Sequence, residues 1–408
     1  MAAMSAARRW LATTAVGVGL STSVVACTPP IEIGPRTVPV TTTTVAVGYP
    51  ATPVGDDQIH LNQIQLVGTH NSYHIAPAPQ ILDLISSAAA AVPAISAGLG
   101  NPASLNYTHA SIPQQLARGI RTFEFDIWAD PTGNRFANPA LAANLGFTDP
   151  LRPTGLEVPG FKVFHIVDVD WRTECVSLQV CLGEIRTWSN AHPGHLPIVI
   201  NVELKDGALP APLSGTPVLP FDGPTLDAVD AELNTAIGDR IITPDTVRGA
   251  AADLNTAITT TGWPTLAASR GKVLFFMDNE SLRTAYLTGH PSLVGRTMFT
   301  SSGEGQPDGA ILKVNDPTNG VLISQLVAQG YIVRTRADAD SVEAWTNNTS
   351  RRDIALASGA QIVHTDYPVG EPYSNGYQVN LGLPAQGRCN PVTTAPASCV
   401  QSAVVEPH

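Results

Sequence analysis

The chain has 408 residues, of which 43% are apolar and 14% are charged, and its formal net charge at pH 7 is −11. This length allows one large domain or two ordinary ones. The acidic balance, without a run of Lys or Arg, argues against a general nucleic-acid binder and against adsorption to an anionic membrane through a basic patch. Low charge with many small residues is typical of an exported protein.

The first 26 residues have the pattern of an export signal. Arg8 and Arg9 form a basic start, an apolar stretch of small residues runs from Trp10 to Ala26, and Cys27 follows. A small residue before the cut and a Cys after it are typical of a bacterial lipoprotein, in which the Cys carries lipid. The stretch is too short for a convincing transmembrane helix. We therefore expect a cell-envelope lipoprotein anchored to the membrane surface through Cys27, or a secreted protein if the signal is an ordinary one.

Composition divides the rest of the chain into three parts. Residues 27–58 are rich in Pro, Thr and Val and are expected to form an extended linker. Residues 59–383 carry the pattern of a folded domain. Residues 384–408 contain Pro, Thr, Ser and the last two cysteines, and are expected to form a short irregular tail that a disulfide staples.

The cysteines predict two disulfides. If Cys27 carries lipid, four cysteines remain, and they pair by proximity as Cys175 with Cys181 and Cys389 with Cys399. Two short-loop disulfides suit an oxidising compartment. Their spacing does not resemble a zinc site, because no CxxC or matched His pair accompanies them.

From residue 60 onward, short β-branched or aromatic runs alternate with longer stretches that have helical spacing. The runs predict strands over 64–69, 122–128, 162–166, 197–204, 272–277, 296–300, 331–335 and 361–365. The longer stretches predict helices over 112–118, 176–192, 223–237, 246–258, 320–328, 339–347 and 350–358. This α/β alternation indicates a TIM-like (β/α)8 barrel, closed or slightly distorted. The long crossover over 76–112 is either a lid or a surface loop without a role.

Polar residues stand at the strand ends, and the active site of a parallel barrel lies at the carboxyl ends of its strands. Glu124 and Asp126 are two apart in a strand, so their side chains share one face. Two carboxylates inside a barrel are tolerable if a cation lies between them. With Glu203 and the amide oxygen of Asn71 they form a set of hard oxygen ligands, which suits Ca²⁺ or, less well, Mg²⁺.

A second interpretation of the carboxylates needs no metal, because Arg334 or Lys205 could form a buried salt-bridge network with them. The histidines favour the metal. His70 and His165 end the first and third predicted strands, and a barrel would bring them to the two sides of the cation. Such a site suits phosphodiester cleavage: one His takes a proton from an attacking hydroxyl or stabilises the phosphorane, and the other protonates the leaving oxygen. The cation neutralises phosphate charge and lowers the pKa of a coordinated hydroxyl.

Four further charged residues end predicted strands and have two possible roles. They either contact the substrate or neutralise the ligand carboxylates from behind. They are Lys205, Arg334, Arg336 and Asp366.

Six segments, in the same order, resemble the calcium-dependent bacterial branch of phosphatidylinositol-specific phospholipase C. They are 68–73 (GTHNSY), 119–126 (GIRTFEFD), 163–170 (VFHIVDVD), 191–206, 270–274 and 359–368, and they extend over roughly 60–370. The resemblance implies a TIM-like barrel in which the inositol 2-hydroxyl attacks phosphorus, diacylglycerol leaves and a cyclic inositol phosphate forms. It also implies catalytic roles for two histidines and Ca²⁺ ligation by four residues, namely His70 and His165, and Asn71, Glu124, Asp126 and Glu203.

The chain departs from the eukaryotic relatives at the fifth strand. There the family supplies lysines that grip extra phosphates on inositol, whereas residues 274–278 here contain none. We therefore do not expect recognition of polyphosphorylated headgroups.

Three alternatives remain for the function. A glycerophosphodiester phosphodiesterase and a sphingomyelinase D-like enzyme use the same barrel, but the former usually has His-Arg-Gly where this chain has His70-Asn71-Ser72. A non-catalytic exported binding lipoprotein is disfavoured, because all six catalytic and ligand positions are filled. The expected partners are a phospholipid or glycerophosphodiester substrate and no nucleic acid, and the expected state is a monomer.

Overall fold

The computed structural model describes residues 55–209, 213, 215–382, 386–393 and 399–406. The chain divides into units 1–48 and 49–408, and every described residue belongs to the second. The predicted signal, Cys27 and nearly all of the predicted linker lie outside the described residues. In the described part, no helix has the length and apolar character needed to cross a membrane.

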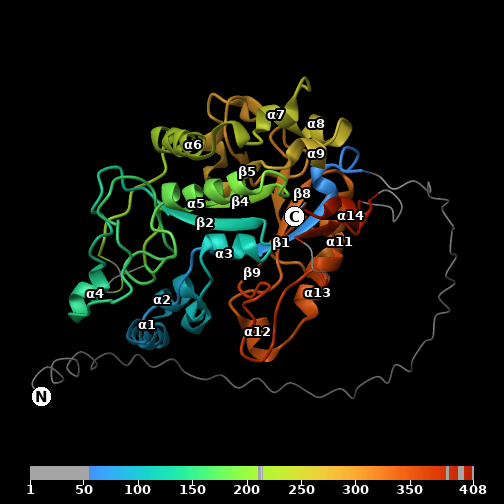
Figure 1. The fold of residues 1–408 in the computed structure, drawn as a ribbon. Helices are drawn as coiled ribbons and strands as arrows, with labels where there is room; N and C mark the ends of the chain where they lie inside the picture. Colours follow the sequence, from blue (N-terminus) through green and yellow to red (C-terminus); the bar gives the residue numbers. More distant parts are fainter. Residues whose placement is uncertain (1–54, 210–212, 214, 383–385, 394–398, 407–408) are drawn as a thin grey trace, which may run out of the picture. The chain divides into compact units, whose positions relative to one another are not determined.

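Eight parallel strands form the wall of a barrel (Figure 1). Pairing runs from β2 through β4 and β5 to β6, and from β7 through β8 and β9 to β1. A single parallel bridge between Ser301 and Ile311 joins these two halves. The strands are β1 (Ile64–Thr69), β2 (Thr122–Trp128), β4 (Ile198–Leu204), β5 (Val273–Met277), β6 (Phe299–Thr300), β7 (Ile311–Lys313), β8 (Ile332–Arg336) and β9 (Ile362–Thr365).

The barrel is distorted between β1 and β2, which belong to different sheets. There β1 pairs with the antiparallel β10 (Gly387–Cys389), and β2 pairs with the antiparallel β3 (Lys162–Val163). The two barrel strands nevertheless pack closely, since a Cβ added to Gly68 would lie 2.2 Å from the carbonyl oxygen of Thr122. Only glycine permits this approach. The predicted TIM-like architecture is therefore confirmed, with a seam at this position.

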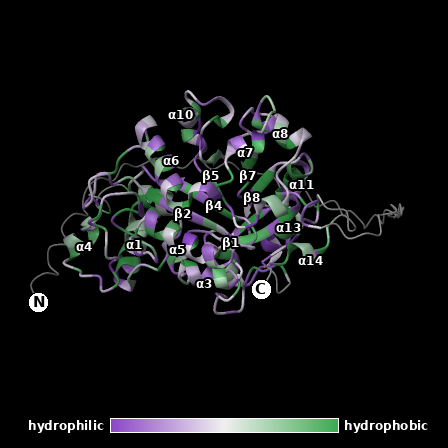
Figure 2. Cartoon of the chain, turned by 45° about the horizontal axis from the view of Figure 1, so that its top comes forward, coloured by the Kyte–Doolittle hydropathy of each residue, from purple (hydrophilic) through white to green (hydrophobic). Residues whose placement is uncertain are grey.

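Helices surround the strands, and the buried faces of both form one large apolar cluster. Figure 2 shows hydrophobic residues, in green, on both the strands and the helices. The α-helices are α1 (Pro79–Ala91), α2 (Pro93–Leu99), α3 (Ile112–Ala117), α4 (Ala140–Leu145), α5 (Leu178–Ala191), α6 (Gly223–Ile237), α7 (Pro244–Arg248), α8 (Leu254–Thr260), α9 (Leu266–Ser269), α10 (Arg283–Leu287), α11 (Gly320–Ala328), α12 (Val342–Thr346), α13 (Ser350–Ala357) and α14 (Gln401–Val404). Single 3-10 turns cover Leu61–Gln63, Pro102–Leu105, Gly238–Arg240, Glu280–Leu282 and Pro291–Leu293.

The long crossover after β1 is folded rather than irregular. Its helices α1 and α2 lie together with α4, away from the strands (Figure 1). Ile81, Ile85 and Ile95 pack there against Leu141 and Trp171 in a second, smaller core. The segments that follow β1 and β2 therefore form one helical cap on the side of the barrel where these strands end.

Two predictions about the elements are wrong. Residues 162–166 do not form a barrel strand, because Val163 bonds to the carbonyl of Val176 and the chain then turns, so that only the two-residue β3 remains. The predicted helix over 246–258 is two helices, since Gly249 has a φ of 52° and ends α7. The barrel strand that the sequence analysis missed is β7, which has only three residues.

The C-terminal segment closes the end of the barrel opposite the cap. Both predicted disulfides are confirmed, and Cys389–Cys399 joins β10 to the start of this last segment. Glu406 accepts hydrogen bonds from Arg121, just before β2, at 2.6 and 2.5 Å, and from the backbone of Leu196, just before β4, at 2.7 Å. The predicted irregular tail thus contains a strand and a short helix that fix it to the strand starts.

Candidate active site

Three carboxylates meet inside the barrel at the carboxyl ends of β2 and β4. Glu124 and Asp126 alternate along β2 and so share a face, and Asp126 lies opposite Glu203 in the register of β4. One oxygen from each of the three lies within 4.8 Å of the others. Glu124 and Asp126 are buried, while Glu203 is partly exposed. The strand periodicity and the parallel register together bring about the cluster that the sequence predicted.

Asn71 approaches this cluster from β1. The backbone of Ser72 donates a 3.0 Å hydrogen bond to the carbonyl of Glu124, which places the loop beside β2. Asn71 has a φ of 45°, and its buried amide faces the Tyr107 hydroxyl but makes no well-formed hydrogen bond among the described residues. Asp126 Oδ1 likewise has no partner within the described part, and Oδ2 is met by Lys205, at 3.2 Å. Buried oxygens left in this state fit a hard cation such as Ca²⁺.

Two basic side chains contact the carboxylates, as the metal-free interpretation predicted. Lys205 Nζ lies 3.2 Å from Asp126 Oδ2 and 3.0 Å from Glu203 Oε1. Arg334 is buried and donates to Glu124 Oε2 at 2.5 Å. Burial would raise the pKa of Glu124, but the Arg334 guanidinium and the nearby His70 hold it well below its usual range. The same carboxylates therefore form salt bridges, as the metal-free interpretation requires, and provide the oxygen atoms that a Ca²⁺ site requires.

Burial and two neighbouring carboxylates act on the pKa of Asp126. Burial raises this pKa well above its usual range, although the Lys205 ammonium lowers it, and the charges of Glu203 and Glu124 raise it further. A bound divalent cation would favour the ionised form of Asp126.

His70, which follows β1, is held by a carboxylate after β9. Its Nδ1 lies 2.8 Å from Asp366 Oδ1, and Arg336 lies 3.3 Å from Oδ2 of the same group. Burial would raise the pKa of Asp366, but His70 and Arg336 hold it far below its usual range. An ionised carboxylate only accepts, so the Nδ1 of His70 carries the proton and its Nε2 remains available.

His165 is held in the same way, although it lies in a loop and not at the end of a barrel strand. Its Nδ1 lies 2.9 Å from Asp170 Oδ2, and the Nε2 of the buried His74 lies 2.8 Å from the same oxygen. Burial would raise the pKa of Asp170, but His74 and the bond from His165 lower it to about 2. Burial lowers the pKa of His165 itself, against the opposing effect of Asp170.

A cavity of about 360 Å³ joins parts of this site. His165, Glu203 and Lys205 line it together, and its wall includes Trp128, Asp206, Gly207, Ala208 and Asn279. A substrate phosphate in this cavity would therefore meet an imidazole, a carboxylate of the cluster and an ammonium.

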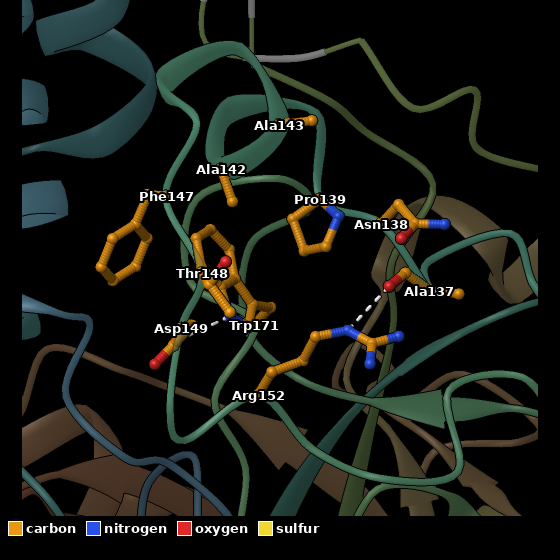
Figure 3. Close-up of a pocket in the computed structure, with 10 residues that line it drawn as sticks. All are labelled: Ala137, Asn138, Pro139, Ala142, Ala143, Phe147, Thr148, Asp149, Arg152 and Trp171. Carbon is orange, nitrogen blue, oxygen red and sulfur yellow. Dashed lines mark hydrogen bonds between the residues drawn. The ribbon is translucent and has the colours of Figure 1, made fainter.

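A second cavity, of about 290 Å³, lies beside α4 and contains none of the predicted site residues (Figure 3). Trp171 donates to Asp149 at 2.9 Å there, and Arg152 reaches the carbonyl of Ala137 at 2.8 Å. These bonds hold the cap together, and we assign this cavity no part in the reaction.

Residues 59–391 match the family described as "Phosphoinositide phospholipase C, Ca2+-dependent". The chain belongs to this family. The match includes the carboxylate cluster, both histidines and their carboxylate partners, and it confirms the family that the sequence motifs predicted. Members are phosphodiester hydrolases that depend on Ca²⁺.

Solved phospholipases C of this type resemble the chain only distantly. A calcium-dependent phosphoinositol-specific phospholipase C from Pseudomonas sp. in its apo form has 17% identity and a TM-score of 0.49, with 82% of this chain and 96% of that chain covered. A Ca²⁺-dependent phosphatidylinositol-specific phospholipase C from Streptomyces antibioticus has 17% identity and a TM-score of 0.48, with 76% and 95% covered. No curated protein sequence matches significantly. Because the TM-scores are below 0.5, the family match alone carries the assignment.

The sequence analysis does not find three residues of this candidate site. Asp170 holds His165, His74 shares that carboxylate, and His364 Nδ1 lies 3.0 Å from Glu124 Oε2 inside the barrel. Asp170 was within a motif segment, five residues after His165, and that spacing was the available signal. His74 had no such signal, because any single His is more often a packed residue. His364 stood at a predicted strand end, two residues before Asp366, and that position was its signal.

Proposed function

We propose that the chain cleaves phosphatidylinositol as a Ca²⁺-dependent phospholipase C, with His70 and His165 as its acid/base pair. One observation carries the proposal: each histidine has its Nδ1 on an ionised carboxylate, Asp366 or Asp170, at the barrel end that holds the carboxylate cluster. Each Nε2 is thereby available to exchange a proton with substrate. A non-catalytic module would need neither arrangement.

In the proposed reaction the inositol 2-hydroxyl attacks phosphorus and the bond from phosphorus to the glycerol oxygen breaks. One histidine takes the proton of the attacking hydroxyl, and the other gives a proton to the departing diacylglycerol oxygen, so that a cyclic inositol phosphate remains. Asp366 and Asp170 keep each imidazole in one tautomer and orientation.

Asn71, Glu124, Asp126 and Glu203 are the residues that would hold calcium. The bound ion supplies positive charge that neutralises the phosphate and lowers the pKa of a nearby hydroxyl. The support for these ligands is the shared 4.8 Å cluster of the three carboxylates and the buried Asn71 amide, which makes no well-formed hydrogen bond among the described residues.

The headgroup that fits best is inositol without further phosphates. The chain of β5 contributes buried apolar side chains, Leu274, Phe275, Phe276 and Met277, where a polyphosphorylated ring would need cations. Lys313, on the nearby β7, is already paired with Asp278 at 2.7 Å.

The test is activity on phosphatidylinositol vesicles with Ca²⁺ and with a chelator, with the water-soluble product identified by ³¹P NMR. We expect cyclic inositol phosphate, formed only with Ca²⁺. Glycerophosphoinositol and sphingomyelin complete the panel. Cleavage of glycerophosphoinositol alone, or choline released from sphingomyelin, would replace the proposal with one of the other phosphodiesterases of this barrel.

We also propose that the enzyme acts outside the cytoplasm. Support comes from the two disulfides and from the signal pattern that ends at Cys27. Radiolabelled palmitate should be incorporated into the wild-type protein and not into a Cys27→Ala variant. If neither protein is labelled, Cys27 carries no lipid and the secreted form is the remaining expectation.

A further inference from the structure

The ammonium of Lys205 lies where two clustered carboxylates converge. Lys205 is the first residue after β4, and its Nζ is 3.2 Å from Asp126 Oδ2 and 3.0 Å from Glu203 Oε1. A Ca²⁺ ion held by Asp126 and Glu203 would repel an ammonium that pairs with the same two carboxylates. The lysine and the ion would then compete for the same oxygens.

We propose that Lys205 is a calcium-gated residue, which neutralises Asp126 and Glu203 without calcium and turns to the substrate phosphate when these carboxylates bind calcium. The inference rests on the proposed function, because it takes Asp126 and Glu203 as calcium ligands. It adds a coupling: occupation of the metal site supplies the phosphate site with its cation.

Arg334 and Arg336 also lie near the site, but other partners hold their guanidinium groups in place. Arg334 is buried and held by Glu124, Asn315 and His364 together. Arg336 is paired with Asp366, which also holds His70. Among the described residues, the Lys205 ammonium pairs only with the two carboxylates that would bind the ion.

The side chain has room to turn. Lys205 lines the cavity of about 360 Å³ together with His165, and the small residues Gly207 and Ala208 line the same space. Its side chain is 21% exposed. A flexible four-carbon stem can therefore carry the ammonium into the cavity by rotation about side-chain bonds, without a change in β4.

The new position would serve the reaction. His165 lies on this cavity, so a phosphate that reaches the imidazole is also within the space that the ammonium enters. A cation placed there stabilises the charge that develops on the phosphoryl oxygens.

The proposed movement of Lys205, called the gate below, can be tested by thermal unfolding. The variants are Lys205→Met and Lys313→Met, and each is measured in a chelator and in saturating Ca²⁺. Lys313 is the matched control, since it pairs with Asp278 at 2.7 Å and not with the cluster. We expect K205M to lower Tm in the chelator and to match the unmodified protein in Ca²⁺, because the lysine has then already left. K313M should lower Tm in both. An equal loss for K205M in both conditions would overturn the inference.

Calcium affinity, measured by calorimetry with Ca²⁺ alone, gives a second test that does not depend on the stability of one variant. K205M removes the competitor and should bind Ca²⁺ at least 10-fold more tightly. Lys205→Arg keeps the charge and offers a planar fork that suits carboxylates better, so its affinity should fall. The same Ca²⁺ affinity in all three proteins would contradict competition.

The affinity for inorganic phosphate tests whether the Lys205 ammonium enters the cavity when Ca²⁺ is bound. With Ca²⁺ bound, the unmodified protein should bind phosphate about 10-fold more tightly than K205M, and in the chelator the two should bind it alike. A loss of phosphate binding in K205M that is the same with and without Ca²⁺ would mean that the lysine does not move.

The outcomes separate this inference from the proposed function. If Ca²⁺ neither binds nor stabilises the unmodified protein, the calcium site and the gate fall together. If Ca²⁺ stabilises it while K205M behaves like K313M, the gate alone falls, and cleavage of phosphatidylinositol by the unmodified protein stands.

Discussion

His74 and His165 share one carboxylate oxygen: their Nε2 and Nδ1 atoms lie 2.8 and 2.9 Å from Asp170 Oδ2. His74 is buried, and its Nδ1 contacts the carbonyl of Tyr107 at 3.0 Å, so its ring is fixed at both nitrogens. The buried His74 therefore fixes the position of Asp170, and Asp170 in turn orients His165, which lines the cavity.

Asp170→Asn is expected to lower kcat by about 10²-fold with little change in KM, because an uncharged amide, with one acceptor oxygen and an NH₂ donor, fixes the tautomer of His165 less well than a carboxylate. Steady-state kinetics on phosphatidylinositol measures the two constants. Asp149→Asn is the control, since Asp149 is a buried carboxylate of the cap bonded to Trp171 and Arg172. A normal kcat in Asp170→Asn would show that His165 needs no orienting carboxylate.

His70→Ala and His165→Ala should each lose about 10²–10⁴ in kcat, the usual contribution of one general acid or base. The Ca²⁺ affinity of His165→Ala should stay near that of the wild-type protein, because His165 contacts Asp170 and not the carboxylate cluster. Near-normal turnover in either variant would remove that histidine from the mechanism.

Glu124→Gln is expected to raise the Ca²⁺ concentration needed for half-maximal activity at least 10-fold, since an amide is a weaker ligand than a carboxylate. Activity at saturating Ca²⁺ should recover in part. Asp278→Asn, which alters a carboxylate after β5 that pairs with Lys313, serves for comparison and should leave the Ca²⁺ requirement unchanged. Equal Ca²⁺ requirements in both variants would argue against Glu124 as a ligand.

Glu232 predicts a pH effect on stability outside the active site. Burial raises its pKa to about 7, so the folded protein bears the cost of the ionised form above that pH, whereas in the unfolded chain the group ionises near 4. Stability is therefore lost as pH rises from about 4 to 7. Glu232→Gln should raise Tm relative to the unmodified protein at pH 8 and leave it little changed at pH 4. A variant without advantage at pH 8 would contradict the raised pKa.

Glu406→Gln should destabilise the protein by about 3 kcal/mol, because it leaves the buried Arg121 without its charged partner. The double variant with Arg121→Met should recover part of the loss, since no unpaired charge remains. Denaturant unfolding measures both. The kcat of each folded variant should be unchanged, because this ion pair lies at the strand starts.

Strand periodicity explains how much of the site could be predicted. Glu124 and Asp126 had to share a face once β2 was recognised. The position of Glu203 beside Asp126 did not follow in the same way, because the predicted strand over 162–166 would have separated β4 from β2, whereas the structure pairs β2 with β4 directly. The geometry of the barrel therefore follows from local pattern wherever strands are long enough to show it.

The remaining features depend on contacts that no local pattern encodes. β7 has three residues, too few for alternation to show. His165 was expected at a strand end but lies in a loop whose path depends on Asp170 and His74. The pairing of β10 with β1 joins residues more than 300 positions apart, and a propensity-based reading of the tail could not find it.

The pairing of β10 with β1 has a consequence for the order in which the enzyme is completed. β1 leads directly to His70 and Asn71, yet its outer edge is covered by Gly387–Cys389, and Glu406 ties down the start of β2. A nascent chain emerges from the ribosome with its amino end first, so the edge of β1 stays open until β10, more than 300 positions later, has been made. The strand that carries His70 and Asn71 is therefore completed only after that later segment has been synthesised.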